Sequence, residues 1–268
     1  MMTKSLIIPK KSLGQNFLVN PRILDKIVAT AEISKEDTVL EVGPGTGNLT
    51  KKLAEKAGKV IAIEKDRRLI QELKNLFRGE KNVEIIEGDI LKILPTTLNT
   101  QHSKYKIVAN IPYYITSRFL RTVFEKWPKP KLIVLTTQKE VAQRITAKPP
   151  RMNLLALSVQ FFAEPKIIGY ISKENFRPRP KVDSAIIKLT PKEELPTDDI
   201  EKFFKIIQAG FSQKRKLLVS NLSKKFGIMK EELLKIFAKI DIQPNVRAEN
   251  LSLNKWVDLA GYFKKLPA

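Results

Sequence analysis

The stretch "KIVANIPYYITSRF" (106–119) places groups that can hold a flat base by its amine directly after an apolar, strand-like run. The side-chain oxygen of Asn110 and the main-chain carbonyl of Ile111 can each accept one N–H of an exocyclic amine. Pro112 fixes the backbone that carries this carbonyl. An amine held by two fixed acceptors is drawn toward tetrahedral geometry, which frees its lone pair for attack. The spacing therefore predicts chemistry at a base amine.

Two aromatic residues are candidates for stacking on such a base. Tyr113 follows Pro112 directly, and Phe176 lies in "NFRPRPKVDS", where Pro178 and Pro180 stiffen the loop. Rings of this kind stabilise a base that has been lifted out of its helix. The alternative is that both are ordinary core aromatics.

A glycine-rich turn between a predicted strand and a predicted helix forms a second candidate site. "LEVGPGTGNLT" places Gly43, Gly45 and Gly47 where a tight turn allows a ligand to approach the backbone. A dinucleotide-binding pattern requires glycine at the sixth position, which here is Asn48. The spacing G-x-G-x-G, led by Glu41, resembles instead the first motif of class I methyltransferases, which bind S-adenosylmethionine. A purely structural turn is the alternative.

Acidic residues end the next two predicted strands. Glu64 lies about twenty residues after the glycine turn, where a carboxylate can accept both ribose hydroxyls. Asp89, in "EGD", can accept from an adenine amine. Because parallel strands end at one edge of a sheet, these groups and Asn110 are expected together. They predict a nucleoside cofactor.

The order of the elements predicts a doubly wound α/β fold. Nearly continuous apolar strands alternate with helical patterns from about 35 to 135, which is typical of a parallel sheet covered on both faces. "LALSVQFFAEPKIIGYIS" and "SAIIKLT" are expected to add an antiparallel edge. "TPKEELPTDD" (190–199) is interpreted as a linker, so we expect an α/β domain over 1–191 and a small helical domain over 192–268.

The charge indicates a polyanionic partner. The 268 residues include 49 Lys plus Arg against 28 Asp plus Glu, a net charge of +21. Nucleic acid is the first interpretation and an anionic membrane surface the second. Two clusters are candidates for RNA phosphate contacts, with a solvated charged surface as the alternative; they are Arg177, Arg179 and Lys181, and Lys214, Arg215 and Lys216.

Several classes of site are excluded or not expected. The chain has no cysteine, so disulfides, thiolate metal sites and cysteine nucleophiles are excluded. The one histidine, His102, lies in a polar stretch interpreted as a surface loop, and no metal site is expected. No apolar run approaches the ~20 residues of a membrane span, and the N-terminus is too polar for a secretory signal. We therefore expect a cytoplasmic protein, as a monomer.

Taken together, these motifs resemble the ribosomal RNA adenine dimethyltransferase family of the KsgA type. "KKSLGQNFLVNPRILDKI", "EVGPGTGNLT", "IEKD", "EGDIL", "NIPYYIT" and "NFRPRPKVDS" occur in the family's order, and "FSQKRKLLVSNL" and "VRAENLSLNKW" resemble its helical domain. The resemblance implies a class I methyltransferase fold that is Rossmann-like, with an antiparallel edge hairpin and a small C-terminal helical domain. It implies dimethylation of two adjacent adenines near the 3′ end of small-subunit rRNA, during maturation of that subunit. It also implies cofactor contacts from Asn16 and Leu18.

The sequence departs from the family pattern at two places, and two other functions stay open. Tyr114 stands where asparagine is common, and "AKPPRMNLLALSV" lacks the usual turn with glycine and tyrosine. The alternatives are a large-subunit rRNA methyltransferase of the antibiotic-resistance type, and a non-catalytic RNA-binding assembly factor. "FSQKRK" and "RAENLS" favour the small-subunit enzyme over the first, and Glu64, Asp89 and Asn110 argue against the second.

Overall fold

The structure of the chain is a computed structural model, and it describes residues 9–10, 13–93 and 105–263. His102 lies outside these residues.

The chain divides into two compact units. The first comprises 1–142 and 165–191, and the second comprises 143–164 and 192–268. Residues 143–164, which we expected in the first domain, thus belong to the second unit.

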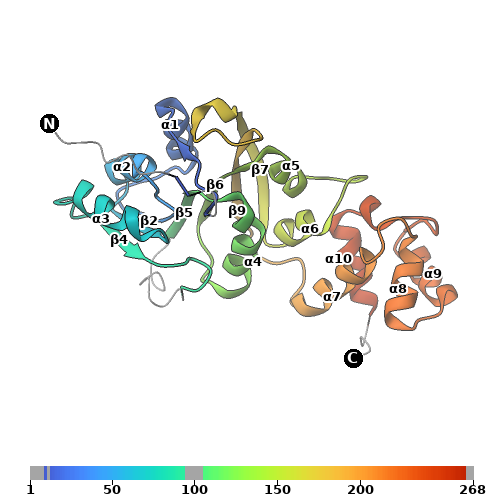
Figure 1. Cartoon of the computed structure of the whole chain (residues 1–268). Coiled ribbons are helices and arrows are strands. Elements are labelled where there is room, and N and C mark those ends of the chain that lie inside the picture. Colours follow the sequence, from blue (N-terminus) through green and yellow to red (C-terminus); the bar gives the residue numbers. More distant parts are fainter. Residues whose placement is uncertain (1–8, 11–12, 94–104, 264–268) are drawn as a thin grey trace. The chain divides into compact units, whose positions relative to one another are not determined.

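Seven of the described strands form one sheet, in the order β4-β3-β2-β5-β6-β9-β7 (Figure 1). Pairing between β2, β3, β4, β5 and β6 is parallel, whereas β9 runs antiparallel to β6. The expected Rossmann-like sheet with an antiparallel edge is therefore confirmed. The strands are β2 (Thr38–Val42), β3 (Lys59–Glu64), β4 (Val83–Glu87), β5 (Tyr105–Asn110), β6 (Leu132–Gln138), β7 (Ala163–Ile171) and β9 (Ser184–Pro191).

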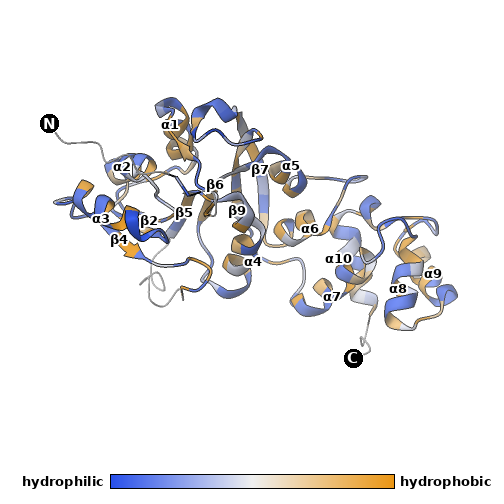
Figure 2. Cartoon of the chain, viewed as in Figure 1, coloured by the Kyte–Doolittle hydropathy of each residue, from blue (hydrophilic) through white to orange (hydrophobic). Residues whose placement is uncertain are grey.

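Helices flank this sheet and bury its apolar side chains. Leucine and isoleucine side chains of α1 and α2 form one core with valines from four central strands. Since β2 is buried almost throughout, both faces of the sheet are covered. Figure 2 shows helices that carry hydrophilic and hydrophobic residues on different sides. The helices are α1 (Pro21–Thr30), α2 (Asn48–Lys56), α3 (Arg67–Leu76), α4 (Thr116–Lys126) and α5 (Lys139–Ile145).

The second unit is helical and has its own aromatic core. Phe161 and Phe203 lie with ring centroids 4.5 Å apart, and Trp256 is fully buried. Residues 211–217, expected within a helical segment, instead link two helices without being helical. The helices are α6 (Leu154–Gln160), α7 (Ile200–Gly210), α8 (Leu218–Phe226), α9 (Lys230–Lys239) and α10 (Leu253–Tyr262).

The segment "LALSVQ" was expected as a strand, and this prediction was wrong. It forms α6, which begins after Asn153. The Asn153 side chain accepts a hydrogen bond from the backbone N–H of Ala156 at 3.0 Å and so caps the helix. The strand β7 begins only at Ala163.

A buried ion pair joins Asp37, directly before β2, to Lys106 near the start of β5. These two central strands lead to the candidate site. Lys106, near the start of β5, donates to Asp37 Oδ2 at 2.9 Å, and both residues are about 95% buried. Asp37 also accepts from the backbone N–H and the hydroxyl of Ser34. Burial raises the pKa of Asp37, but the hydrogen bonds from Lys106 and Ser34 outweigh it, so the net pKa is lowered.

Replacing Lys106 with methionine should lower the free energy of unfolding by about 3–5 kcal/mol, because it leaves the Asp37 carboxylate buried without its cation. Urea denaturation at neutral pH measures this change. Lys188→Met is the matched control, since Lys188 pairs with the exposed Glu32 carboxylate and such pairs contribute only ~0–1 kcal/mol. Equal losses in the two variants would contradict the assigned role of the buried pair.

Candidate functional site

A cavity of about 230 Å³ opens at the carboxyl ends of the parallel strands in the first unit. This edge of an open α/β sheet is where such folds bind ligands. The structure brings most of the predicted site residues together around this cavity. Those lining it are Asn16, Gly43, Gly45, Glu64, Asp89, Asn110, Ile111, Pro112 and Tyr113.

The glycine turn after β2 has the conformation that its residues predict. Gly43 and Gly45 have φ values of +69° and +60°, a region that side chains with a Cβ rarely adopt. At Gly45, an added Cβ would also lie only 2.7 Å from the Phe17 ring. The turn therefore depends on glycine both for its backbone conformation and for the close approach of the N-terminal segment.

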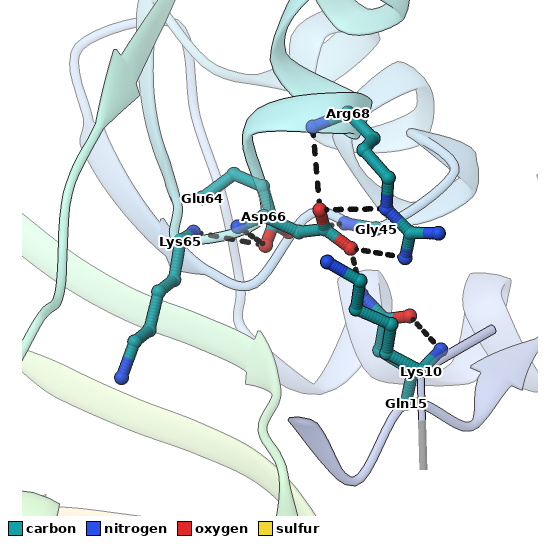
Figure 3. Close-up of polar contacts among 7 residues, drawn as sticks. All are labelled: Lys10, Gln15, Gly45, Glu64, Lys65, Asp66 and Arg68. Atoms are coloured by element: carbon teal, nitrogen blue, oxygen red, sulfur yellow. Dashed lines mark hydrogen bonds and ion pairs between the residues drawn. The ribbon is translucent and has the colours of Figure 1, made fainter. Parts of the chain in front are cut away.

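The carboxylate of Glu64, at the end of β3, is held by backbone N–H groups (Figure 3). Its Oε1 accepts from Lys65 at 2.9 Å and from Asp66 at 2.8 Å, and its Oε2 accepts from Gly45 at 3.2 Å. Burial raises the pKa of Glu64, and these three hydrogen bonds oppose the rise. The carboxylate lines the cavity and so can also accept hydroxyl groups of a ligand.

Asp66 connects α3 to the N-terminal segment, residues 13–18. The sequence analysis did not identify this role of Asp66. Its carboxylate caps α3 through the Arg68 N–H, pairs with the Arg68 guanidinium at 2.7 Å, and accepts from Gln15 Nε2 at 2.9 Å (Figure 3). Gln15 in turn accepts from the backbone N–H of Lys10 at 2.7 Å. The Arg68 guanidinium holds the pKa of Asp66 well below its usual range. An acidic N-cap residue such as Asp66 can be predicted from the local sequence. Its contact with Gln15 cannot, because the two residues are 51 positions apart.

Asp89 is paired with Lys65, another contact that the sequence did not reveal. Lys65 Nζ lies 2.9 Å from Asp89 Oδ2, and Asp89 Oδ1 accepts from the backbone N–H of Leu91. Burial raises the pKa of Asp89, but the Lys65 and Leu91 hydrogen bonds lower it overall. The carboxylate is thus charged and fixed at the cavity wall.

Asn110 is oriented by the N-terminal segment. Its Nδ2 donates to the Asn16 carbonyl at 3.1 Å, which turns Oδ1 the other way, and Asn16 Nδ2 donates to the Gly14 carbonyl. Within the described residues, neither Asn110 Oδ1 nor the Ile111 carbonyl accepts a hydrogen bond. Pro112 follows with φ −56° and ψ 131°. Two acceptors thus remain available at the cavity.

Tyr113 and Phe176 differ in accessibility. Tyr113 is partly buried at the cavity wall, and its hydroxyl shares a 2.6 Å hydrogen bond with Ser184. Burial raises the pKa of this hydroxyl. Phe176 is fully buried in the main core.

Phe176 therefore does not present the open ring face that the sequence analysis expected. It belongs to β8 (Phe176–Arg177) and pairs with Leu18 of β1 (Phe17–Leu18). Leu18 is also buried and lies outside the main cavity, although it lines a smaller neighbouring one. Stacking by Phe176 requires a conformational change around this strand pair and stays a prediction, as does a direct cofactor contact by Leu18.

The first basic cluster is only partly available for phosphate. Arg177 donates to the carbonyls of Glu174 and Phe176, and Arg179 pairs with the Glu174 carboxylate at 2.8 Å. Lys181 is exposed and forms no ion pair with any described residue.

The second basic cluster lies in the linker between α7 and α8. Lys214, Arg215 and Lys216 are exposed, without ion pairs to residues that the structure describes. The buried Asn221 holds the linker, because its Nδ2 donates to the carbonyls of Gly210 and Gln213. This anchor was not predicted.

Glu41 has the most unusual environment near the site. It is 1% exposed, and its Oε2 has no hydrogen-bond partner within the part of the chain that is described. Burial raises the pKa of Glu41 to about 8. It lines a small cavity that Gly43, Asn48 and Asn110 also line. The sequence identified Glu41 as part of a motif, without a role of its own.

No group of acidic or histidine side chains able to hold a metal ion occurs in the described part of the chain. Among the described helices, none is long and apolar enough to cross a membrane.

Comparison with known proteins identifies the family. Residues 9–265 match the family described as ribosomal RNA adenine dimethylase. The chain belongs to the ribosomal RNA adenine dimethylase family. Among curated members, it is 42% identical over 261 residues to the ribosomal RNA small subunit methyltransferase A of Dehalococcoides mccartyi. That alignment covers 97% of this chain and 90% of the relative.

Two solved structures have the same fold as this dimethylase. A dimethyladenosine transferase from Plasmodium falciparum is 33% identical with a TM-score of 0.79, covering 92% of this chain and 97% of that chain. The 23S rRNA methyltransferase ErmE is 26% identical with a TM-score of 0.76, covering 92% and 98%. The expected family and fold class are therefore confirmed.

The buried Glu41 carboxyl of this dimethylase predicts a pH dependence of stability. Because its pKa is raised on folding, the folded state binds a proton that the unfolded state has released between about pH 4.5 and 8. Wild-type stability should therefore fall across this range, by up to about 1.4 kcal/mol per pH unit from this group.

Glu41→Gln should show a smaller fall, because glutamine does not ionise. Urea unfolding of the two proteins at pH 5, 6, 7 and 8, without added ligand, measures the difference. Glu55→Gln makes the same change at an exposed position. If the Glu41 variant and the wild type lose stability in parallel, the carboxyl is not held protonated.

Proposed function

We propose that this dimethylase methylates the exocyclic amines of two adjacent adenines near the 3′ end of small-subunit rRNA, within the immature small subunit. The observation that carries the proposal is the pair of available acceptors, Asn110 Oδ1 and the Ile111 carbonyl, at one cavity wall. The names of the curated relatives at about 40% identity support the small subunit as the target. The transfer of two methyl groups to each of two adjacent adenines is implied by the resemblance to the family.

The cavity fits S-adenosylmethionine as the cofactor. Glu64 is fixed to accept ribose hydroxyls, Asp89 to accept an adenine amine, and the turn at Gly43 and Gly45 leaves no side chain between ligand and backbone. The Glu41 carboxyl oxygen without a partner is a further polar group behind that turn. Asn16 and Leu18 are assigned to cofactor contacts by the family motif. When bound, S-adenosylmethionine supplies a methyl group carried on a positively charged sulfur.

The residues of this chain prepare the adenine amine for attack. Asn110 Oδ1 and the Ile111 carbonyl each accept one N–H, which weakens delocalisation of the nitrogen lone pair into the ring. Pro112 holds the carbonyl, and the Asn16 carbonyl holds the Asn110 amide, so both acceptors are fixed before the substrate arrives. No side-chain base is required, since the methylated nitrogen is acidic and releases its proton to water.

Tyr113 stacks on the target adenine from one side. Its ring lines the cavity beside Pro112, and the Ser184 hydrogen bond limits rotation of the phenol. Stacking on an aromatic ring stabilises an unpaired base by ~1–3 kcal/mol, which offsets part of the loss of stacking in the RNA.

Residues from 192 onward serve as the RNA-binding domain. Lys214, Arg215 and Lys216 are exposed on a linker that Asn221 holds in place, which suits contacts with phosphates. Arg177, Arg179 and Lys181 are proposed as further contacts. We expect the protein to act as a monomer in the cytoplasm, where its proposed ribosomal RNA substrate is found.

The target is tested with labelled S-adenosylmethionine and two substrates, namely small subunits lacking the modification and protein-free large-subunit rRNA. Nucleosides are identified by mass spectrometry after digestion. Dimethyladenosine in the small subunit alone is the expected result. Label confined to the large-subunit RNA would show that this protein has the activity of the similar 23S rRNA methyltransferase instead. RNA binding without any label would show that it is a non-catalytic factor.

Asn110→Ala should slow methyl transfer on the order of 10²–10³-fold, because one of the two acceptors for the amine is lost. The measurement is the single-turnover rate at saturating cofactor and substrate, with circular dichroism to verify the fold. Asn75→Ala, on the exposed surface of α3, is the control. A rate within a few fold of wild type would refute the proposed amine geometry.

Lys214→Ala combined with Arg215→Ala should weaken binding to unmethylated small subunits and reduce the slope of log affinity against log salt by about 1–2. Titrations at several salt concentrations measure both quantities. Lys235→Ala with Lys239→Ala removes the same charge from the surface of α9. If both pairs change the slope equally, net charge alone accounts for binding.

A further inference from the structure

The two adjacent tyrosines of the site, Tyr113 and Tyr114, have different surroundings. Both belong to the 3₁₀ turn Tyr113–Ile115, and both line the main cavity. Tyr113 is partly buried and bonded to Ser184, whereas Tyr114 is 61% exposed. Because a 3₁₀ helix has three residues per turn, neighbouring side chains diverge by about 120°. The two side chains therefore leave the backbone in different directions, and the Tyr114 ring is available for a contact of its own.

The Tyr114 ring is nevertheless positioned by its surroundings. A Cβ built on Gly14 would lie 3.3 Å from Tyr114 Cδ1 and Cε1 and 3.5 Å from Pro112 Cβ. The ring thus lies directly against the N-terminal segment, next to the proline that follows the amine-binding carbonyl. An aromatic ring that is supported on one side and exposed on the other offers a surface for stacking.

A cation that forms no ion pair with the described residues lies four residues further along the chain. Arg118, in the first turn of α4, lines the same cavity and is exposed. Its guanidinium forms no ion pair with any residue that the structure describes. By contrast, Lys65 at this wall is already paired with Asp89. Lys65 and Arg118 both line the cavity. Only Arg118 is available to bind a ligand, and it lies four residues after Tyr114.

An exposed ring and an exposed guanidinium that line the same cavity match the chemistry of one nucleotide, because the ring stacks on a base and the guanidinium binds a phosphate oxygen. Tyr113 and the amine acceptors already account for the target adenine. We propose that Tyr114 and Arg118 form a second nucleotide subsite, which holds the RNA nucleotide next to the adenine being methylated. Tyr114 stacks on the neighbouring base, and Arg118 binds the phosphate that joins the two nucleotides.

This subsite rests on the proposed function and adds a role to it. Two adjacent adenines must enter the cavity in turn, and a platform beside the reaction site holds one while the other reacts. Since a ring face accepts any base, the platform needs no rearrangement when the two adenines exchange places.

The test is equilibrium binding of unmethylated small subunits to Tyr114→Leu, Tyr114→Phe and Arg118→Gln, at several salt concentrations. Tyr114→Leu should lower affinity about 5–100-fold and leave the salt slope unchanged, while Tyr114→Phe should stay within about twofold of wild type. Arg118→Gln should reduce the salt slope by about 1. In methylation assays, KM for the subunit should rise in Tyr114→Leu and Arg118→Gln with little change in kcat.

Matched controls lie elsewhere in the same unit. Tyr170→Leu removes a ring that is 56% exposed on β7, and Arg78→Gln removes an exposed guanidinium after α3. Neither residue lines the main cavity, and neither change should alter the measured quantities beyond about twofold.

Calorimetric titration with S-adenosylmethionine separates the subsite from the cofactor site. The cofactor affinity of Tyr114→Leu should equal that of the wild type. A loss of cofactor affinity with unchanged subunit affinity would overturn the proposal, because the ring would then cover the cofactor. Wild-type affinity and salt slope in all three variants would also overturn it. Failure of the wild type to methylate small subunits would instead count against the proposed function.

Discussion

The buried carboxylate of Glu64 is the contact on which the arrangement of the site depends. It accepts N–H groups from the glycine turn after β2 and from the first two residues after β3, so three backbone N–H groups of two segments meet at two oxygens. A carboxylate that is 94% buried is stable only when such donors replace water, and a shift of any segment leaves it unsatisfied. From Asp66 the polar contacts continue to Gln15 and the N-terminal segment, whose Asn16 carbonyl orients Asn110. The groups proposed to bind the cofactor and the amine thus belong to one connected set of hydrogen bonds.

The cavity wall carries charges of both signs, in a chain of net charge +21. The carboxylates Glu64 and Asp89 line it together with Lys65, which is paired with Asp89, and Arg118. Carboxylates suit a cofactor that carries a sulfonium, while exposed lysines and arginines suit phosphates. If the acidic groups were exposed, they would repel the RNA that must approach them. Burial and the Lys65 pair reduce this repulsion, so both kinds of ligand can bind close together.

Much of the fold could be predicted because its signals are local. The apolar runs that form β2, β3, β4, β5 and β6 are continuous, and the acids and amide that end them were identified from their positions. One error concerns a local signal that was missed: α6 has an apolar sequence compatible with a strand, but Asn153 caps it as a helix. The other errors concern contacts that no local pattern records. Phe176 precedes two prolines in a segment interpreted as a loop, yet it pairs with Leu18, 158 residues earlier, and is buried in the core. The Gln15–Asp66 contact also joins residues far apart in sequence, at a separation of 51 residues.

The two tyrosines after Pro112 show how the backbone assigns different roles to one residue type. In an extended strand, alternate residues face opposite sides of the sheet, so one of the two would leave the cavity altogether. In the 3₁₀ turn both remain at its wall, at different depths and in different directions. The hydroxyl of the more buried Tyr113 shares a hydrogen bond with Ser184 of β9, and the exposed Tyr114 ring lies against Gly14. A glycine at position 14 is needed for this second contact, since its φ of +61° and the 3.3 Å approach both disfavour a side chain. The N-terminal segment therefore shapes the side of the cavity that we propose for RNA as well as the side proposed for the cofactor.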